Sequence, residues 1–201
     1  MMESSFLKLS LFVLALLLVL GGVSSPAENA PAAPGLLYTN DFGTDPTKDT
    51  DNKWWVSDPT KITWVQDVLH EGKGSLKLSN IDNTKIVSTY GPYVAYTGQA
   101  VRLSIELKQD SVTTGGIAMN PTAKAGIGIY YYDQDKKEIN IPWPKYHDHL
   151  DLPDSTLDWD TYEKTFTLPA AATGVAFVRV VITLPGSGTI WVDNINLVLS
   201  P

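Results

Sequence analysis

From Gly35 onward, short runs of alternating apolar and polar residues recur between clusters of glycine, proline, asparagine and aspartate. Such alternation is typical of strands with one buried face. No segment carries the apolar stripe of an amphipathic helix, which repeats about every 3.6 residues. The sequence therefore predicts an all-β fold, an antiparallel β-sandwich jelly roll with about nine strands.

The turn-forming clusters set the bounds of the expected strands. These strands are Leu36–Phe42, Ile62–Val68, Ser75–Asn80, Lys85–Tyr90, Val101–Lys108, Gly126–Tyr132, Tyr162–Leu168, Val175–Thr183 and Thr189–Leu199. In Val101–Lys108 every second residue is apolar, so one face is expected to lie in the core. In Thr189–Leu199 the alternation changes phase after Val192, and a β-bulge near Asp193 would restore it.

The N-terminal segment is expected to lie outside this fold. Leu11–Leu20 is wholly apolar, but as a helix it would span only about 15 Å, half of a bilayer core. Small residues follow it, so residues 1–27 are predicted to be a secretory signal peptide, with an uncleaved membrane anchor as the alternative. Residues 28–35 are predicted to be a Pro/Ala linker, and residues 36–201 the domain. We therefore expect a secreted, periplasmic or cell-surface protein without membrane contact after cleavage.

The composition excludes several classes of function. The chain has no Cys, which excludes disulfides and thiolate metal sites. Its 22 acidic residues outnumber its 15 basic ones, for a net charge of -7, which argues against binding to nucleic acid. We expect a monomer that is held together by packing or by a bound ion.

Aromatic residues are concentrated in the predicted domain. All 6 Trp and 9 Tyr lie at or beyond Tyr38, so the domain has either a heavily aromatic core or a surface that binds with flat rings. Alternation places rings and charged groups on the outward faces of three strands, and these residues are Tyr130, Tyr132, Phe177, Arg102, Glu106 and Arg179. If the strands are neighbours in one sheet, that face suits an oligosaccharide, because sugar C–H faces stack on rings and hydroxyls pair with Arg and Glu. The alternative is that a loop covers the rings.

The segment from Ile139 to Asp158 is a long connection that is rich in aromatic residues. Long loops in compact domains are commonly functional, and Trp143 and Tyr146 are expected to form a rim over the sheet face. His147 and His149 would lie on one side of an extended chain. With no third ligand in view, we interpret them as surface residues rather than a metal site.

Several sequence blocks, in order, carry a family resemblance. They are Gly72–Leu78, Val101–Lys108, Gly128–Asp133, Trp159–Pro169 and Gly188–Ile195. Together they resemble the group of carbohydrate-binding modules that includes families four, nine, sixteen and twenty-two, and the resemblance covers Leu36 to Leu199. It implies a galactose-binding-like jelly roll that binds β-glucan, xylan or a related polysaccharide on a concave, aromatic-lined face without cleaving it. The positions that match its ring-bearing strands are Tyr90, Tyr130 and Tyr132.

The resemblance also implies a metal site. Members of the group often hold a structural calcium between the first and last strands, with a carboxylate after an N-terminal Phe and the Asp of the closing motif. Asp193 matches the closing motif, but the residue after Phe42 is Gly43. We therefore expect calcium only if Asp41 substitutes for the missing acid; oxygen ligands would suit the ion.

No convincing catalytic motif is present, and we predict that the protein is not an enzyme. A glycosidase would need two carboxylates about 5 to 9.5 Å apart, for which Glu106 is the candidate acid and Glu138 a remote partner. Trp159 and Trp191 lie in the fold-marking blocks and are expected in the core.

The sequence thus predicts an exported, non-catalytic module that binds polysaccharide of the β-glucan or xylan class. The expected sugar-binding residues are Trp54, Tyr90, Arg102, Glu106, Tyr130, Tyr132, Trp143, Tyr146 and Arg179. Trp54 and Trp55 are neighbours and would face opposite ways, one into the core and one into the cleft. The alternatives are a cell-surface or adhesion module that does not bind sugar and a small glycoside hydrolase.

Overall fold

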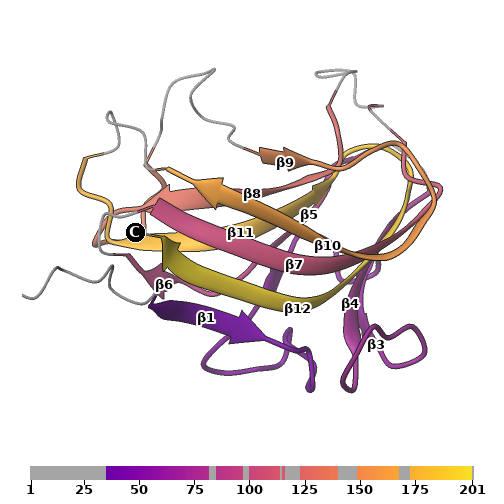
Figure 1. Cartoon of the computed structure of the whole chain (residues 1–201), viewed down its shortest axis with the longest axis horizontal. Helices are drawn as coiled ribbons and strands as arrows, with labels where there is room; N and C mark the ends of the chain where they lie inside the picture. Colours follow the sequence, from indigo (N-terminus) through magenta and orange to yellow (C-terminus); the bar gives the residue numbers. More distant parts are fainter. Residues whose placement is uncertain are drawn as a thin grey trace, which may run out of the picture. The chain divides into compact units, whose positions relative to one another are not determined.

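The computed structural model describes residues 35–81, 85–96, 100–113, 115, 123–139, 149–167 and 173–200. Within these ranges every regular element is a strand, and the strands form two six-stranded antiparallel sheets that pack face to face (Figure 1). The predicted all-β sandwich is therefore confirmed. In the described part of the chain, no helix is long and apolar enough to cross a membrane. The predicted signal peptide lies outside the described residues.

Sheet A contains β10, β7, β12, β4 and β3 in that order, with β1 beside the second half of β12. Its strands are β1 (Leu36–Asn40), β3 (Ile62–Val65), β4 (Ser75–Asn80), β7 (Ala100–Asp110), β10 (Leu157–Phe166) and β12 (Gly188–Ser200). In Figure 1, β10, β7, β12 and β1 form the layer nearest the reader.

Sheet B contains β2, β5, β11, β8 and β9 in that order, with β6 also paired to β11. Its strands are β2 (Trp55–Val56), β5 (Val87–Tyr90), β6 (Val94–Ala95), β8 (Gly126–Tyr132), β9 (His149–Asp151) and β11 (Phe177–Leu184). In Figure 1, β8, β11 and β5 lie behind sheet A. All nine strands expected from the sequence exist, and the three additional strands, β2, β6 and β9, are two or three residues long.

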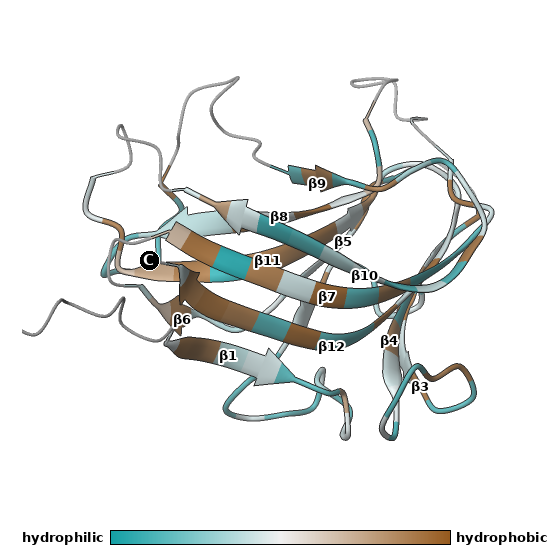
Figure 2. Ribbon diagram, in the orientation of Figure 1, coloured by the Kyte–Doolittle hydropathy of each residue, from teal (hydrophilic) through white to brown (hydrophobic). Residues whose placement is uncertain are grey.

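The core lies between the sheets and is built by alternation. Along β7, the inward residues Val101, Leu103, Ile105 and Leu107 are buried, whereas Arg102 is exposed. Figure 2 shows the same alternation as brown and teal bands along the front strands. Each fully buried aliphatic side chain contributes about 1.5–3 kcal/mol to stability, so the two inward faces supply the main cohesion of this cysteine-free domain.

A β-bulge interrupts β12, as the sequence predicts. The pairing of β12 with β7 shifts register between Asp193 and Asn196, and Asn194 has a left-handed backbone with φ of 44°. The extra residue returns Ile195 to the same buried face as Val192. The bulge therefore allows β12 to contribute buried side chains to the core both before and after Asp193.

Candidate functional site

Sheet B presents aromatic side chains on its outward face. Alternation along β8 buries Ile129 in the core and turns Tyr130 and Tyr132 to the other face of the sheet, where Tyr130 is partly exposed but Tyr132, covered by its neighbours, is only 5% exposed. On the adjacent strand β11, Arg179 lies opposite Tyr130, and Phe177 lies opposite Tyr132. The aromatic face, as we call it, consists of Trp55, Tyr90, Tyr93, Tyr130, Tyr132, Phe177 and Arg179.

The rings of the aromatic face hold one another in edge-to-face pairs. The ring centroid of Tyr90 lies 5.2 Å from that of Trp55 and 5.8 Å from that of Tyr130, at interplanar angles of 71° and 84°. Tyr93 makes the same kind of contact with Tyr132 at 5.0 Å. Such pairs contribute about 0.5–1.5 kcal/mol beyond burial. The rings are therefore held in position before any ligand arrives.

Arg179 lies at the centre of this face. Its Nε donates a hydrogen bond to the carbonyl of Gly91 at 2.6 Å, and its Nη2 donates to the carbonyl of Tyr90 at 3.1 Å. Its guanidinium carbon lies 4.5 Å from the ring centroid of Tyr93 and 5.9 Å from that of Tyr132. Because a guanidinium has five N–H donors, these two bonds fix the side chain and leave donors that can serve a ligand.

Burial keeps the tyrosine hydroxyls of this face protonated. Burial raises the pKa of Tyr130 to about 12, and the neighbouring Tyr90 and Glu138 add to the shift. Burial also raises the pKa of Tyr132 to about 12, although the Arg179 guanidinium acts against this shift. Both hydroxyls therefore stay uncharged even at alkaline pH, and they can donate and accept hydrogen bonds.

Glu138 brings a carboxylate to the same face. A bridge pairs it with Tyr132, and its charge contributes to the raised pKa of Tyr90, Tyr130 and Tyr132. The face therefore combines apolar rings, a fixed donor in Arg179 and an acceptor in Glu138. The sequence analysis named Glu138 only as a remote catalytic partner, because no alternation extends beyond β8 to place it.

Trp55 and His149 mark the two edges of the face. The residue of β8 that pairs with His149 is Gly128, and a Cβ at Gly128 would lie only 2.7 Å from Cδ2 of His149. The absence of a side chain at Gly128 therefore makes room for the imidazole beside Tyr130. From β2 to β9 there are four strand spacings, about 19 Å, which is the length of an oligosaccharide rather than of a single sugar.

Two predicted members of the site lie elsewhere. Arg102 and Glu106 belong to β7, which pairs with β10 and β12 in sheet A, so the prediction that they share a face with Tyr130 is wrong. Alternation gives the face of a strand but not the sheet that contains it. On sheet A, Glu106 Oε1 accepts a hydrogen bond from the Thr161 hydroxyl at 2.8 Å. Glu106 and Glu138 thus lie on different sheets and do not form a glycosidase pair.

The adjacent tryptophans divide between core and surface, but the other way round from the predicted site. Trp54 is 0% exposed, and its Nε1 donates to the hydroxyl of Tyr38 at 3.0 Å. Trp55 is 52% exposed and contacts Tyr90. Trp54 is therefore a core residue, and Trp55 takes the position in the binding site that the sequence analysis gave to Trp54. No sequence signal fixed the phase of the two-residue strand β2.

Two further expectations have different outcomes, and one residue of the face was not expected. Trp159 and Trp191 were expected in the core, but both are partly exposed, because alternation in β12 buries Ile190 and Val192 and turns Trp191 outward. Trp143 and Tyr146 lie outside the described residues. Tyr93, which the sequence analysis did not identify, follows a Gly-Pro pair that breaks the alternation.

The candidate calcium ligands lie near the start and the end of sheet A. Asp193 is 0% exposed, and its carboxylate accepts hydrogen bonds from the backbone N–H groups of Asn194 at 2.8 Å and Glu71 at 3.3 Å. Asp41 accepts one from Gly43 at 3.0 Å. Among the described residues, no group of three acidic or histidine side chains is arranged to hold a metal.

Calcium requires six to eight oxygen ligands, whereas positive N–H dipoles point at both carboxylates. Two carboxylates alone supply fewer oxygen ligands than the ion requires. The expected calcium stays a prediction, and melting the protein with and without a chelator tests it, because removal of a bound ion would lower the midpoint.

The fold is similar to those of several solved structures. No protein-family model matches the sequence, and no curated protein sequence matches it. The CBM22-1 xylan-binding domain of Xyn10C from Paenibacillus barcinonensis is similar with a TM-score of 0.52 and 13% identity, over 83% of this chain and 96% of that one. The CBM22-1 and GH10 modules of xylanase 10B from Clostridium thermocellum, complexed with xylohexaose, give a TM-score of 0.54 at 12% identity, over 84% of this chain and 29% of that one.

A tailspike protein of bacteriophage CBA120 is similar to the same degree, with a TM-score of 0.54 and 13% identity over 82% of this chain and 22% of that one. Identities this low show the fold alone. The described part of the chain therefore has the jelly-roll fold of the carbohydrate-binding modules that the sequence blocks resemble.

Proposed function

We propose that this protein is an exported, non-catalytic module that binds polysaccharide of the β-glucan or xylan class on the aromatic face. The observation that carries the proposal is the arrangement around Arg179. A fixed guanidinium lies among rings that are already locked, at an outward sheet face whose edge residue Trp55 is half exposed.

The roles of the residues follow from their chemistry. Trp55 and Tyr90 offer ring surface on which the C–H faces of sugars stack, which removes apolar surface from water. Arg179 donates hydrogen bonds to sugar hydroxyls, and Glu138 accepts them. Because these groups are held by protein contacts, little conformational entropy is lost on binding.

The ligand class is supported by the neighbours in fold. One of them is described as a xylan-binding domain, and another is complexed with xylohexaose. Binding without cleavage is supported by the separation of Glu106 from Glu138 on different sheets. Export is supported by the apolar run Leu11–Leu20.

Gel electrophoresis through xylan, β-glucan, mannan and galactan tests the proposal. We expect retardation of the full-length mature protein by at least one β-linked polymer. Arg179→Ala should weaken the affinity about tenfold, because a hydrogen bond from a charged donor contributes roughly 1.5–3 kcal/mol.

Arg102→Ala is the matched control, because it removes an exposed arginine from the opposite sheet. It should leave retardation unchanged. If none of the polymers retards the protein, the proposal is overturned. If the protein releases reducing ends from the same polymers, it is a hydrolase and not a non-catalytic module.

A further inference from the structure

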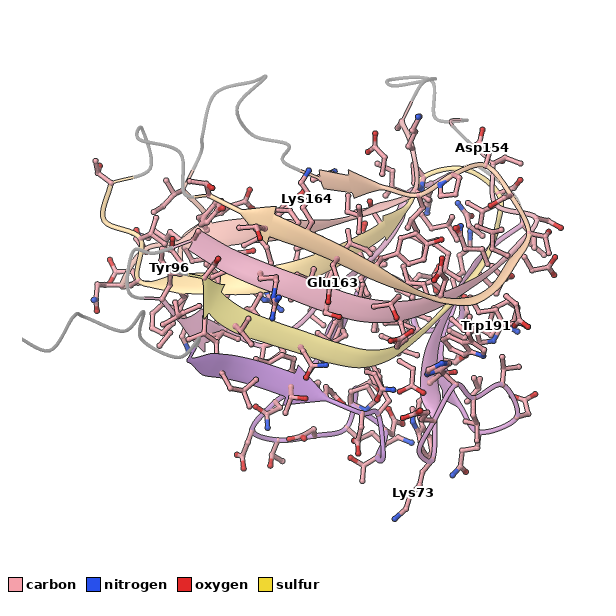
Figure 3. All side chains as sticks on the ribbon, in the orientation of Figure 1. Lys73, Tyr96, Asp154, Glu163, Lys164 and Trp191 are labelled. Atoms are coloured by element: carbon pink, nitrogen blue, oxygen red, sulfur yellow. The ribbon has the colours of Figure 1, made fainter. Side chains whose placement is uncertain are left out.

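The outward face of sheet A carries two partly exposed tryptophans that the core does not need. Trp191 lies on β12 between Ile190 and Val192, which fill the core side of that strand and are both 0% exposed. Figure 3 shows Trp191 near the end of the front layer where β12 begins. Trp159 lies on β10, the strand that pairs with β7. It is one of the residues within the register shift between Leu157 and Asp160.

These rings belong to one row that crosses four strands. Lys108 of β7 pairs with Trp191 and lies between the two tryptophans, and Lys77 of β4 pairs with Trp191 on its other side. We call Trp159, Lys108, Trp191 and Lys77 the tryptophan row. The rings are two strand spacings apart, about 10 Å, which is comparable to the length of a disaccharide.

Both lysines of the row have a partner within the protein. Lys108 Nζ bonds Asp158 Oδ1 at 2.6 Å. Lys77 Nζ lies 5.6 Å from the ring centroid of Trp191, where the π-system attracts the cation. The ion pair neutralises the charge of Lys108, and the ring of Trp191 holds the ammonium group of Lys77 in place.

The neighbours of the row also favour a sugar over a protein partner. Beside Trp191, the hydroxyls of Ser79 and Thr189 lie 3.1 Å apart and are hydrogen bonded. Lysine is depleted from the centres of protein interfaces, whereas this row alternates lysine with tryptophan. Flat rings, ammonium donors and hydroxyl groups together match the surface of a neutral carbohydrate.

His70 supports one end of the row. Its ring centroid lies 5.5 Å from that of Trp159, and the next residue, Glu71, donates its backbone N–H to Asp193 on β12. The connection between β3 and β4 is thus fixed over sheet A beside the row. Trp159 is held from one side and remains partly exposed.

We propose that the tryptophan row is a second carbohydrate-binding surface, which takes a neutral β-linked oligosaccharide on the sheet opposite the aromatic face. The ligand class rests on the proposed function, but the location is independent of it. Each molecule would then bind two oligosaccharides, one on each sheet, and could bridge two polysaccharide chains.

The number of ligands per protein tests this. Isothermal titration with xylohexaose, cellohexaose and mannohexaose should give two bound molecules for the wild type. The double variant Trp159→Ala/Trp191→Ala should bind one, and Trp55→Ala/Arg179→Ala should also bind one, now on the tryptophan row. Trp159→Phe/Trp191→Phe retains rings and should restore two sites, and Glu163→Gln, on the same face outside the row, is the matched control.

A wild-type readout covers the case in which a variant fails to fold. The indole N–H resonances of Trp159 and Trp191 should shift on titration, whereas that of the buried Trp54 should stay. If the wild type binds one oligosaccharide, loses it in Trp55→Ala/Arg179→Ala and shows no shift at Trp159 or Trp191, the second surface is excluded and the proposed function stands. If the wild type binds none of the three ligands, both proposals fail.

Discussion

At the scale of single residues, Asp193 shows how a buried carboxyl group is accommodated. It has no exposed surface, and the bulge of β12 supplies the N–H of Asn194 while the β3–β4 connection supplies that of Glu71. Burial nevertheless raises its pKa from the ordinary value of 3.8, with the backbone N–H groups opposing the shift. The hydrogen bonds therefore offset only part of the cost of removing the charge from water.

This shift predicts a pH dependence of stability. A raised folded-state pKa means that the native state binds more protons than the unfolded state, so the free energy of unfolding falls as pH rises from about 3.8 through the folded pKa. Asp193→Asn lacks this titration. We expect the stability difference between the variant and the wild type to grow in favour of the variant from pH 4 to pH 7, measured by urea unfolding. A difference that stays constant over this range would contradict the assignment.

At the scale of elements, strand β2 and the residue before it contain one tryptophan that packs in the core and one that lies on the proposed binding face. Trp54 packs against Phe42 with ring centroids 5.8 Å apart and no exposed surface, and Trp55 extends the aromatic face. Two chemically identical neighbours thus have different roles because successive side chains of a strand point to opposite faces.

Alanine at each of the two positions should separate these roles. Trp54→Ala should lower the free energy of unfolding by about 3–5 kcal/mol, because it leaves a large cavity in the core. Trp55→Ala should change stability far less and weaken polysaccharide binding about tenfold, because it removes an exposed stacking ring. Denaturant unfolding and affinity electrophoresis measure the two effects, and equal losses of stability would contradict the assigned orientations.

The same element explains how far the sequence predicts this molecule. Alternation predicted nine strands, the inward face of β7 and the bulge at Asp193, because these depend on residues near in sequence. It could not assign β7 to sheet A, since strand pairing is set by contacts between residues far apart in the chain. Arg102 and Glu106 were therefore assigned to the wrong sheet, whereas Tyr130, Tyr132 and Arg179 do share one face of sheet B, together with Tyr90, which the family resemblance had added.

At the scale of the whole molecule, the buried tyrosines of the aromatic face make the free energy of unfolding depend on pH in the alkaline range. Tyr130 and Tyr132 both have a pKa of about 12, raised from 10 chiefly by burial. Between these values the unfolded chain loses the phenolic protons and the native state keeps them, so stability falls as pH rises above about 10.

Tyr130→Phe should reduce this alkaline loss. The variant lacks one of the two hydroxyls whose pKa is raised to about 12 but keeps the ring that contacts Tyr90. Its melting temperature should fall less steeply than that of the wild type between pH 10 and pH 12, and the two proteins should have the same dependence between pH 7 and pH 9. A parallel fall above pH 10 would show that other groups dominate the alkaline transition.

The position of β12 has a consequence for the order in which the molecule assembles. This strand pairs with β1, β4 and β7, all of which precede it in the chain, whereas β5, β8 and β11 of sheet B are complete by Leu184. The centre of sheet B can therefore form without residues 188–200, but sheet A has no central strand until these residues pair. Pairings over such long sequence separations form slowly, so the polypeptide stays open, with its inner faces accessible to chaperones, until these 13 residues are available.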